Sequence, residues 1–201
     1  MHDFVGFPKR LYDLRYPAPG SKRIGNQVID LLKRNGLDAQ ADNDRGWDHG
    51  VWVPLLHLRP QADKPLVQLS LNEGMTVDEL ETLGRVLKQL REKNIAIVCS
   101  GSLTHNLREI RMNHDHAADY AKEFETWVRE KVLTGNLEDL KQAHNKSANY
   151  SDSHPTSEHY RPLIVAMAAS VKTDSVNVLK SPILHHTISM ESYVWAGSSW
   201  T

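Results

Sequence analysis

Cysteine is almost absent from this chain of 201 residues, and Cys99 is the single one. One cysteine cannot form an internal disulfide, which favours a reducing compartment such as the cytoplasm. No apolar run approaches the roughly 20 residues that a membrane-spanning helix needs, and nothing near Met1 resembles a signal peptide. We therefore expect a cytoplasmic protein that does not act at a membrane.

Excess charge is also missing, because 24 Lys and Arg residues face 25 Asp and Glu residues. A net charge of −1 argues against a nucleic-acid role that relies on a broad basic face. Apolar residues make up 40% of the chain and charged residues 24%, as in an average globular protein. A chain of this length buries roughly 70% of its extended surface, and we expect one domain over residues 1–201.

Helical spacing of apolar residues marks several segments. Ser21 can cap a helix that Gly36 ends. Thr76 and Glu79 form a capping-box pair before a helix that is expected to reach about Lys93. Two further helices are expected: one opens at Asp115 and buries Tyr120, Phe124, Trp127 and Val128, and one begins near Pro162.

Two segments have the composition of strands. Residues 65–71 place Val67, Leu69 and Leu71 on one side. Residues 95–100 are continuously apolar and β-branched, which predicts a strand buried on both faces of a parallel or mixed sheet. The tail after Lys180 is expected to add one more strand. Helical and strand-like segments alternate, and this order predicts an α/β fold.

His105 lies directly after the second of these strands, in the segment SGSLTHNLR (residues 100–108). Ligands of open α/β sheets bind just beyond the carboxyl ends of the strands, so its position favours a functional role. The alternative is that Thr104 and Asn106 start a helix and that His105 points into solvent.

Two other histidines have polar neighbours that suit chemistry. Asp48 precedes His49 and could orient its imidazole; the alternative is a tight loop in which Gly50 supplies the turn. Glu158 adjoins His159, and His154 lies five residues earlier, so a mixed nitrogen and oxygen metal site is chemically reasonable. Helix capping by residues 156 or 157 is the competing interpretation. His57, inside an apolar stretch, is expected to be a core or strand histidine.

Five segments occur in a telling order: HDFVGFPKRLYDLRYPAPG, GWDHGVWVPL, PLVQLSL, SGSLTHNLR and HPTSEHYRPLIVAMAA. Together they closely resemble the class III extradiol ring-cleavage dioxygenases, in the branch similar to 4,5-DOPA dioxygenase. The resemblance extends from His2 to about Tyr193. No single segment is specific, but their joint occurrence is.

The resemblance implies a three-layer αβα domain with a central mixed sheet and one non-haem metal, Fe(II) or alternatively Zn(II). Such an enzyme opens the ring of a catechol, which is DOPA-like in this branch, with O₂. The family pattern matches metal-binding histidines at His105 and His159 and an active-site histidine at His49. A histidine with a pKa near 6.5 can take a proton from a catechol and return it later. The resemblance favours His105 as a ligand, although a role as base stays open.

One departure from the family pattern has consequences. Members carry two earlier strands that end in HG(S/A)P and AHW, each with a metal-binding histidine, and neither motif occurs in this sequence. We expect a domain that lacks these N-terminal strands, and an impaired activity, because metal binding and folding are coupled. Two functions therefore stay open: an extradiol dioxygenase, or a non-catalytic metal-binding or interaction domain descended from that family. The expected partners are a catechol and O₂, with no nucleic acid and no membrane.

Overall fold

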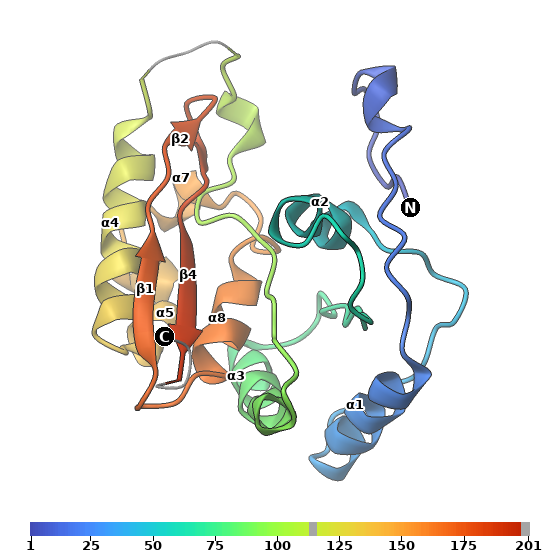
Figure 1. The fold of residues 1–201 in the computed structure, drawn as a ribbon. Coiled ribbons are helices and arrows are strands. Elements are labelled where there is room, and N and C mark those ends of the chain that lie inside the picture. Colours follow the sequence, from blue (N-terminus) through green and yellow to red (C-terminus); the bar gives the residue numbers. More distant parts are fainter. Residues whose placement is uncertain (113–115, 198–201) are drawn as a thin grey trace. The chain divides into compact units, whose positions relative to one another are not determined.

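The structure is a computed structural model that describes residues 1–112 and 116–197 (Figure 1). The chain divides into two compact units, Met1–Asn72 and Glu73–Thr201, and each is described by itself. No helix among the described residues is long and apolar enough to cross a membrane.

The first unit contains three helical elements: η1 (Lys9–Leu11), α1 (Lys22–Arg34) and α2 (His49–Leu58). Its core gathers aromatic and small side chains, namely Tyr16, Ala18, Trp52 and Ala62, with Phe4, Trp47, Leu55, Leu56 and Leu66 packed against them. Two core side chains are hydrogen-bonded to backbone carbonyls outside the core. The Tyr16 hydroxyl donates to the Arg59 carbonyl at 2.8 Å, and the Trp52 indole donates to the Met1 carbonyl at 3.0 Å.

Helix α1 confirms its prediction at both ends. The Ser21 hydroxyl accepts from the Ile24 amide at 3.2 Å, which satisfies one of the free N–H groups at the start. The buried face consists of Val28, Leu31 and Leu32. Gly36 follows the helix with φ of +76°, a conformation that suits glycine.

Helix α2 was not expected from the sequence. Asp48 caps it by accepting from the Val51 amide at 3.2 Å, and Pro54 lies inside the helix. The expectation for His57 is wrong, because this residue is exposed in the last turn of α2. A nearly continuous apolar run gives no helical period, so spacing could not identify this helix.

The second unit contains more elements. They are α3 (Val77–Leu87), η2 (Lys88–Lys93), η3 (Leu107–Glu109), α4 (Asp119–Leu133), α5 (Leu137–Lys141), α6 (Ala143–Lys146), α7 (Tyr150–Ser153), α8 (Arg161–Ala168), β1 (Ser175–Leu179), β2 (Ile183–Leu184), β3 (Ile188–Ser189) and β4 (Ser192–Ala196). Its fully buried side chains include Leu80, Phe124, Val128, Val132, Leu140 and Ile164.

Helix α3 carries the predicted capping box, in which Thr76 and Glu79 bond reciprocally. The α-helix ends at Leu87, and the 3₁₀ helix η2 continues it to Lys93. Helix α3 packs closely on α8 at Gly84, where any side chain would collide with the Val165 carbonyl. A glycine inside this helix therefore serves a close approach between two helices.

Helices α4 and α8 fall where apolar spacing predicts them. Helix α4 buries Phe124 and Val128, as expected, and leaves Tyr120 and Trp127 half-buried. It begins at Asp119, and the predicted start at Asp115 lies outside the described residues. Helix α8 has a proline in its first turn, as predicted.

The α/β class is confirmed, but the strands of the described residues form two separate antiparallel pairs, whereas one central mixed sheet was expected. Strands β1 and β4 lie side by side as an antiparallel pair (Figure 1), and β2 pairs with β3. The tail after Lys180 thus supplies three strands where one was expected.

Neither predicted strand before residue 101 joins a ladder in the described part of the chain. Residues 95–100 alternate between half-buried and exposed positions, and Val98 is 57% exposed, so burial on both faces is wrong. In residues 65–71, Leu66 forms only an isolated parallel bridge with Gly20, and Val67 and Leu69 are exposed. Apolar composition predicts an extended backbone, whereas a strand also needs a hydrogen-bonded neighbour.

Candidate metal centre and its histidines

His105 lies on an extended segment that is fixed on two sides. Its amide donates to the Ser153 carbonyl at 2.8 Å, and it forms an isolated antiparallel bridge with Ile188. Its neighbours Thr104 and Asn106 are buried. The polar flanks of His105 therefore point into the protein, and its imidazole is half-buried. The predicted alternative is correct in one respect, because Asn106 caps the 3₁₀ helix η3 by accepting from the Arg108 amide at 3.0 Å. His105 itself is half-buried and does not project freely into solvent.

His159 lies in the turns that precede α8. The next residue, Tyr160, is buried, and its hydroxyl donates to the Leu140 carbonyl at 2.8 Å. The amides of Tyr160 and Arg161 both donate to the Ser157 carbonyl. A buried anchor on one side and a compact turn on the other hold the backbone of His159.

Gly101 allows the two histidine segments to approach each other. A side chain at position 101 would collide with the backbone carbonyl of His159 and touch Pro162. The small residue after strand-like residues 95–100 is thus a steric requirement, because only glycine lets the two backbones come this close.

The structure brings His105, Glu158 and His159 together. One potential ligand atom from each lies within 4.8 Å of the others. The two imidazoles stack with ring centroids 3.4 Å apart and an angle of 16° between their planes. Within residues 1–112 and 116–197, this is the group of His, Cys, Asp or Glu side chains that is compact enough to share an ion.

Glu158 has the ionisation state that a ligand needs. Partial burial raises the pKa of its carboxyl group, but its own backbone amide, the Thr156 hydroxyl and the nearby His159 and His105 outweigh this and lower the pKa. The Thr156 hydroxyl donates to Glu158 Oε1 at 2.8 Å. Two imidazoles and one carboxylate are a donor set that suits non-haem Fe(II) and also Zn(II).

His154 does not belong to this group. It is 3% exposed, and its Nε2 lies 2.7 Å from the Leu103 carbonyl. Burial lowers the pKa of its imidazole to about 4, since the charged form is costly away from water. His154 is therefore a neutral residue that ties its turn to the segment carrying His105.

His49 lies in the first unit, at the start of α2. Its Nδ1 is 3.0 Å from Asp3 Oδ2, and its amide donates to Asp3 Oδ1 at 3.0 Å. Partial burial raises the pKa of Asp3, yet its hydrogen bonds with His49 outweigh burial and leave the pKa below its ordinary value. Nearly half of the His49 side chain is exposed, so it can meet a small molecule.

The carboxylate that orients His49 is therefore Asp3, and the prediction of Asp48 is wrong. Asp48 caps α2 and accepts from the Gln68 amide group at 2.6 Å. An N-cap side chain bends back toward its own helix, which turns it away from the next residue. Asp3 is 46 positions from His49, so no local spacing signal could have identified it.

The sequence suggests a mixed nitrogen and oxygen metal site around His154, Glu158 and His159, and the structure groups Glu158 and His159 with His105 instead of His154. The irregular turn before α8 allows both side chains to reach the same place. The acidic residue next to a histidine in the segment HPTSEHY was the available signal.

The family of this chain follows from its similarity to known proteins. A model described as the catalytic LigB subunit of aromatic ring-opening dioxygenase matches residues 1–196. The chain belongs to this family. The resemblance to class III extradiol dioxygenases predicted from the five segments is thereby confirmed.

Named relatives of this LigB-family chain point the same way. It is 36% identical to a 4,5-DOPA dioxygenase extradiol of Beta vulgaris, over 89% of this chain and 67% of the relative. It is 34% identical to a protein of the same name from Escherichia coli K12, over 84% of this chain and 63% of the relative. The chain thus spans about two thirds of the length of these relatives. Their names support a dioxygenase-type enzyme by resemblance.

A solved structure shares the fold. The crystal structure of an uncharacterized protein from Escherichia coli K12 superposes with a TM-score of 0.83 at 31% identity, over 93% of this chain and 77% of the other. The LigB-family fold expected from the sequence is confirmed by this likeness.

Proposed function

We propose that the chain is a non-haem metal-dependent extradiol dioxygenase that opens the ring of a catechol with O₂. The observation that carries the proposal is the group of His105, Glu158 and His159 in a chain of the LigB family. A DOPA-like catechol is the proposed substrate, because relatives at 31–36% identity carry the name 4,5-DOPA dioxygenase.

His105, Glu158 and His159 are the proposed metal-holding residues. Fe(II) is the proposed ion and Zn(II) the alternative, since imidazole nitrogen and carboxylate oxygen suit both. When bound, Fe(II) would bring catechol and O₂ together and let electron density pass between them. The grouping of a His105 ring nitrogen with ligand atoms of Glu158 and His159 supports a role for His105 as ligand rather than as base.

His49 is the proposed acid and base. Asp3 accepts from the Nδ1–H of its imidazole and so fixes the tautomer that leaves Nε2 available. In this state Nε2 can take a proton from a catechol hydroxyl, and the Asp3 carboxylate stabilises the imidazolium that forms. The proton can then return from Nε2 as the product develops.

We also propose that the chain is a single catalytic domain and that it is cytoplasmic. One family model matches residues 1–196 across both units, which supports a single catalytic domain. The single Cys99 cannot form an internal disulfide, which supports a reducing compartment such as the cytoplasm.

The test is anaerobic loading of the protein with Fe(II), followed by DOPA or a simple catechol and then O₂. We expect O₂ uptake together with a yellow ring-opened product. Metal uptake without O₂ consumption would instead support a non-catalytic metal-binding domain. Failure to take up any metal would contradict both functions.

A further inference from the structure

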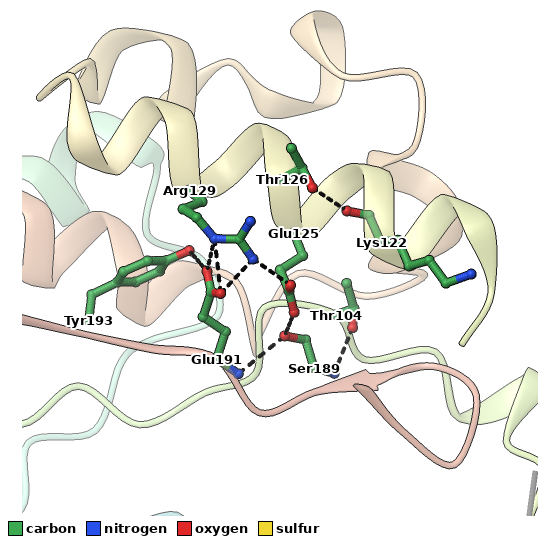
Figure 2. A network of polar contacts seen from close by, with 8 residues as sticks. All are labelled: Thr104, Lys122, Glu125, Thr126, Arg129, Ser189, Glu191 and Tyr193. Carbon is green, nitrogen blue, oxygen red and sulfur yellow. Dashed lines mark hydrogen bonds and ion pairs between the residues drawn. The ribbon is translucent and has the colours of Figure 1, made fainter. Parts of the chain in front are cut away.

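A buried set of polar side chains lies behind the segment that carries His105 (Figure 2). Thr104 is 0% exposed, Ser189 is 2% exposed and Glu191 is 5% exposed. Burial of such groups costs free energy unless each one is hydrogen-bonded. Their bonds therefore show what the set holds in place.

The Thr104 hydroxyl makes two of these bonds. It donates to the Thr187 carbonyl at 2.7 Å and accepts from the Ser189 amide at 2.8 Å. On the other side of His105, the Thr187 hydroxyl donates to the Asn106 carbonyl at 2.9 Å. Both neighbours of His105 are thus hydrogen-bonded to residues 187–189. Because the Thr104 hydroxyl donates one bond and accepts another, its orientation is fixed.

The opposite edge of the same segment is tied to the turn that leads to His159. The His105 amide donates to the Ser153 carbonyl, and the Asn106 side chain donates to the Asp152 carbonyl at 2.9 Å. His105 is therefore held between two segments, one of which continues directly to the other histidine of the metal group.

Ser189 is bonded to a cluster of ion pairs. The Ser189 hydroxyl donates to Glu125 Oε2 at 2.6 Å. The Arg129 guanidinium donates to the carboxylate of Glu125 at 2.6 Å and to that of Glu191 at 2.9 Å. The Tyr193 hydroxyl donates to Glu191 Oε1 at 2.7 Å. Figure 2 shows these side chains converging from α4 and from residues 189–193. Buried ion pairs are a weak source of stability, and fixing one conformation is a role that such groups can have.

We infer that Thr104, supported by Ser189 and the Glu125–Arg129–Glu191 cluster, is a positioning residue for His105. It fixes the backbone from which the imidazole projects, so that this ring meets His159 and Glu158 without rearrangement. The inference rests on the proposed metal-binding function. Loss of a partner that orients a metal ligand typically lowers metal affinity by about 10- to 100-fold.

The test compares Thr104→Val with Thr104→Ser and Thr126→Val. Thr104→Val exchanges the hydroxyl for a methyl group of similar size, and Thr104→Ser keeps the hydroxyl. Thr126→Val makes the same exchange on the exposed side of α4, where the hydroxyl only donates to the Lys122 carbonyl (Figure 2). Each protein is titrated with Co(II), and both the affinity and the visible ligand-field spectrum are measured.

We expect Thr104→Val to lower Co(II) affinity by about 10- to 100-fold and to change the spectrum. Thr104→Ser and Thr126→Val should match the original protein in both. Equal affinity and spectrum in Thr104→Val and Thr126→Val would overturn the inference. If Thr104→Val does not fold, Thr104→Ala decides: it removes the same hydroxyl bonds to the Thr187 carbonyl and the Ser189 amide and adds no methyl group in place of the hydroxyl. Unchanged Co(II) affinity in that variant overturns the inference equally.

Hydrogen exchange of the His105 amide in the metal-free proteins tests the positioning role independently of metal binding. We expect faster exchange in Thr104→Val than in Thr126→Val, because the His105 segment loosens. A protein that takes up no Co(II) in its original form contradicts the metal site itself, and the inference fails with it. Metal uptake by the original protein, with no difference among the variants, contradicts only the positioning role.

Discussion

The two histidine regions of this molecule are built in opposite ways. His105 and His159 project from segments that are clamped by buried hydrogen bonds and by the close approach at Gly101. His49 stands at an exposed helix start and is held by one carboxylate, Asp3. A rigid site suits a metal, which needs ligands in fixed places. A half-exposed imidazole suits proton transfer, which needs access to substrate.

The largest effect is expected for His159→Ala. Loss of one of three ligands should lower metal affinity by more than about 100-fold, above the range of outer partners, and should abolish O₂ uptake. Metal content after dialysis is measured by atomic absorption. His144→Ala, at an exposed histidine, is the control and should keep its metal. Undiminished metal in His159→Ala would contradict the ligand role.

His49→Ala should separate the two regions. We expect catechol turnover to fall by roughly 100- to 10,000-fold, the usual contribution of an acid–base group, while metal content stays unchanged. Asp3→Asn should lower turnover in the same direction and by less, because His49 remains. Steady-state O₂ uptake and metal analysis of the same samples provide the measurement. Metal loss in His49→Ala would mean that the two histidine regions are not distinct in role.

His154 predicts a pH dependence of stability that belongs to the clamped region alone. Burial lowers the pKa of its imidazole to about 4, below the ordinary value near 6.5, so the unfolded state binds more protons between these values. The free energy of unfolding should therefore decrease as the pH falls from 6.5 towards 4. The contribution is on the order of 2 kcal/mol between about pH 7.5 and 5.

Urea denaturation of the metal-free protein at both pH values measures this effect. His154→Gln keeps a donor for the Leu103 carbonyl and cannot titrate, so its stability should fall less than that of the original protein. His144→Gln, at an exposed position, should retain the full decrease. An identical decrease in His154→Gln and the original protein would assign the pH dependence to other groups.

The last comparison concerns two glycines, one in each unit. Gly101→Ala introduces a collision with the His159 carbonyl and should lower the free energy of unfolding by about 1–3 kcal/mol, as overpacking does. Gly25→Ala, in α1 of the first unit, meets no atom within 4 Å and should be neutral or stabilise by up to about 1 kcal/mol. Thermal unfolding of both variants checks the pair. Equal stability would show that residues 101 and 159 are not in close contact.

Local signals predicted the helices well and the strands poorly. The Ser21 cap and the Thr76–Glu79 capping box act within three residues, so the sequence contains the whole interaction. Residues 95–100 carry the composition of a strand, but their pairing depends on distant residues that composition does not name. Helix α2 was missed because its apolar residues show no period.

The same contrast holds for the candidate site. His105 and His159 were identified from their segments, and the structure places them side by side. Asp3 was missed because its bond to His49 joins residues 46 positions apart. The cluster behind Thr104 was also out of reach, since Glu191 and Arg129 are 62 positions apart. Nothing local distinguishes their charges from those of a solvated surface.

The most direct measurement is an anomalous-scattering crystal structure of the protein loaded with Fe(II) under anaerobic conditions, or with Zn(II). We predict one strong anomalous peak between His105 and His159, with a Glu158 carboxylate oxygen within ligand distance. A metal bound elsewhere, or a loaded crystal in which neither histidine touches the ion, would contradict the proposed centre.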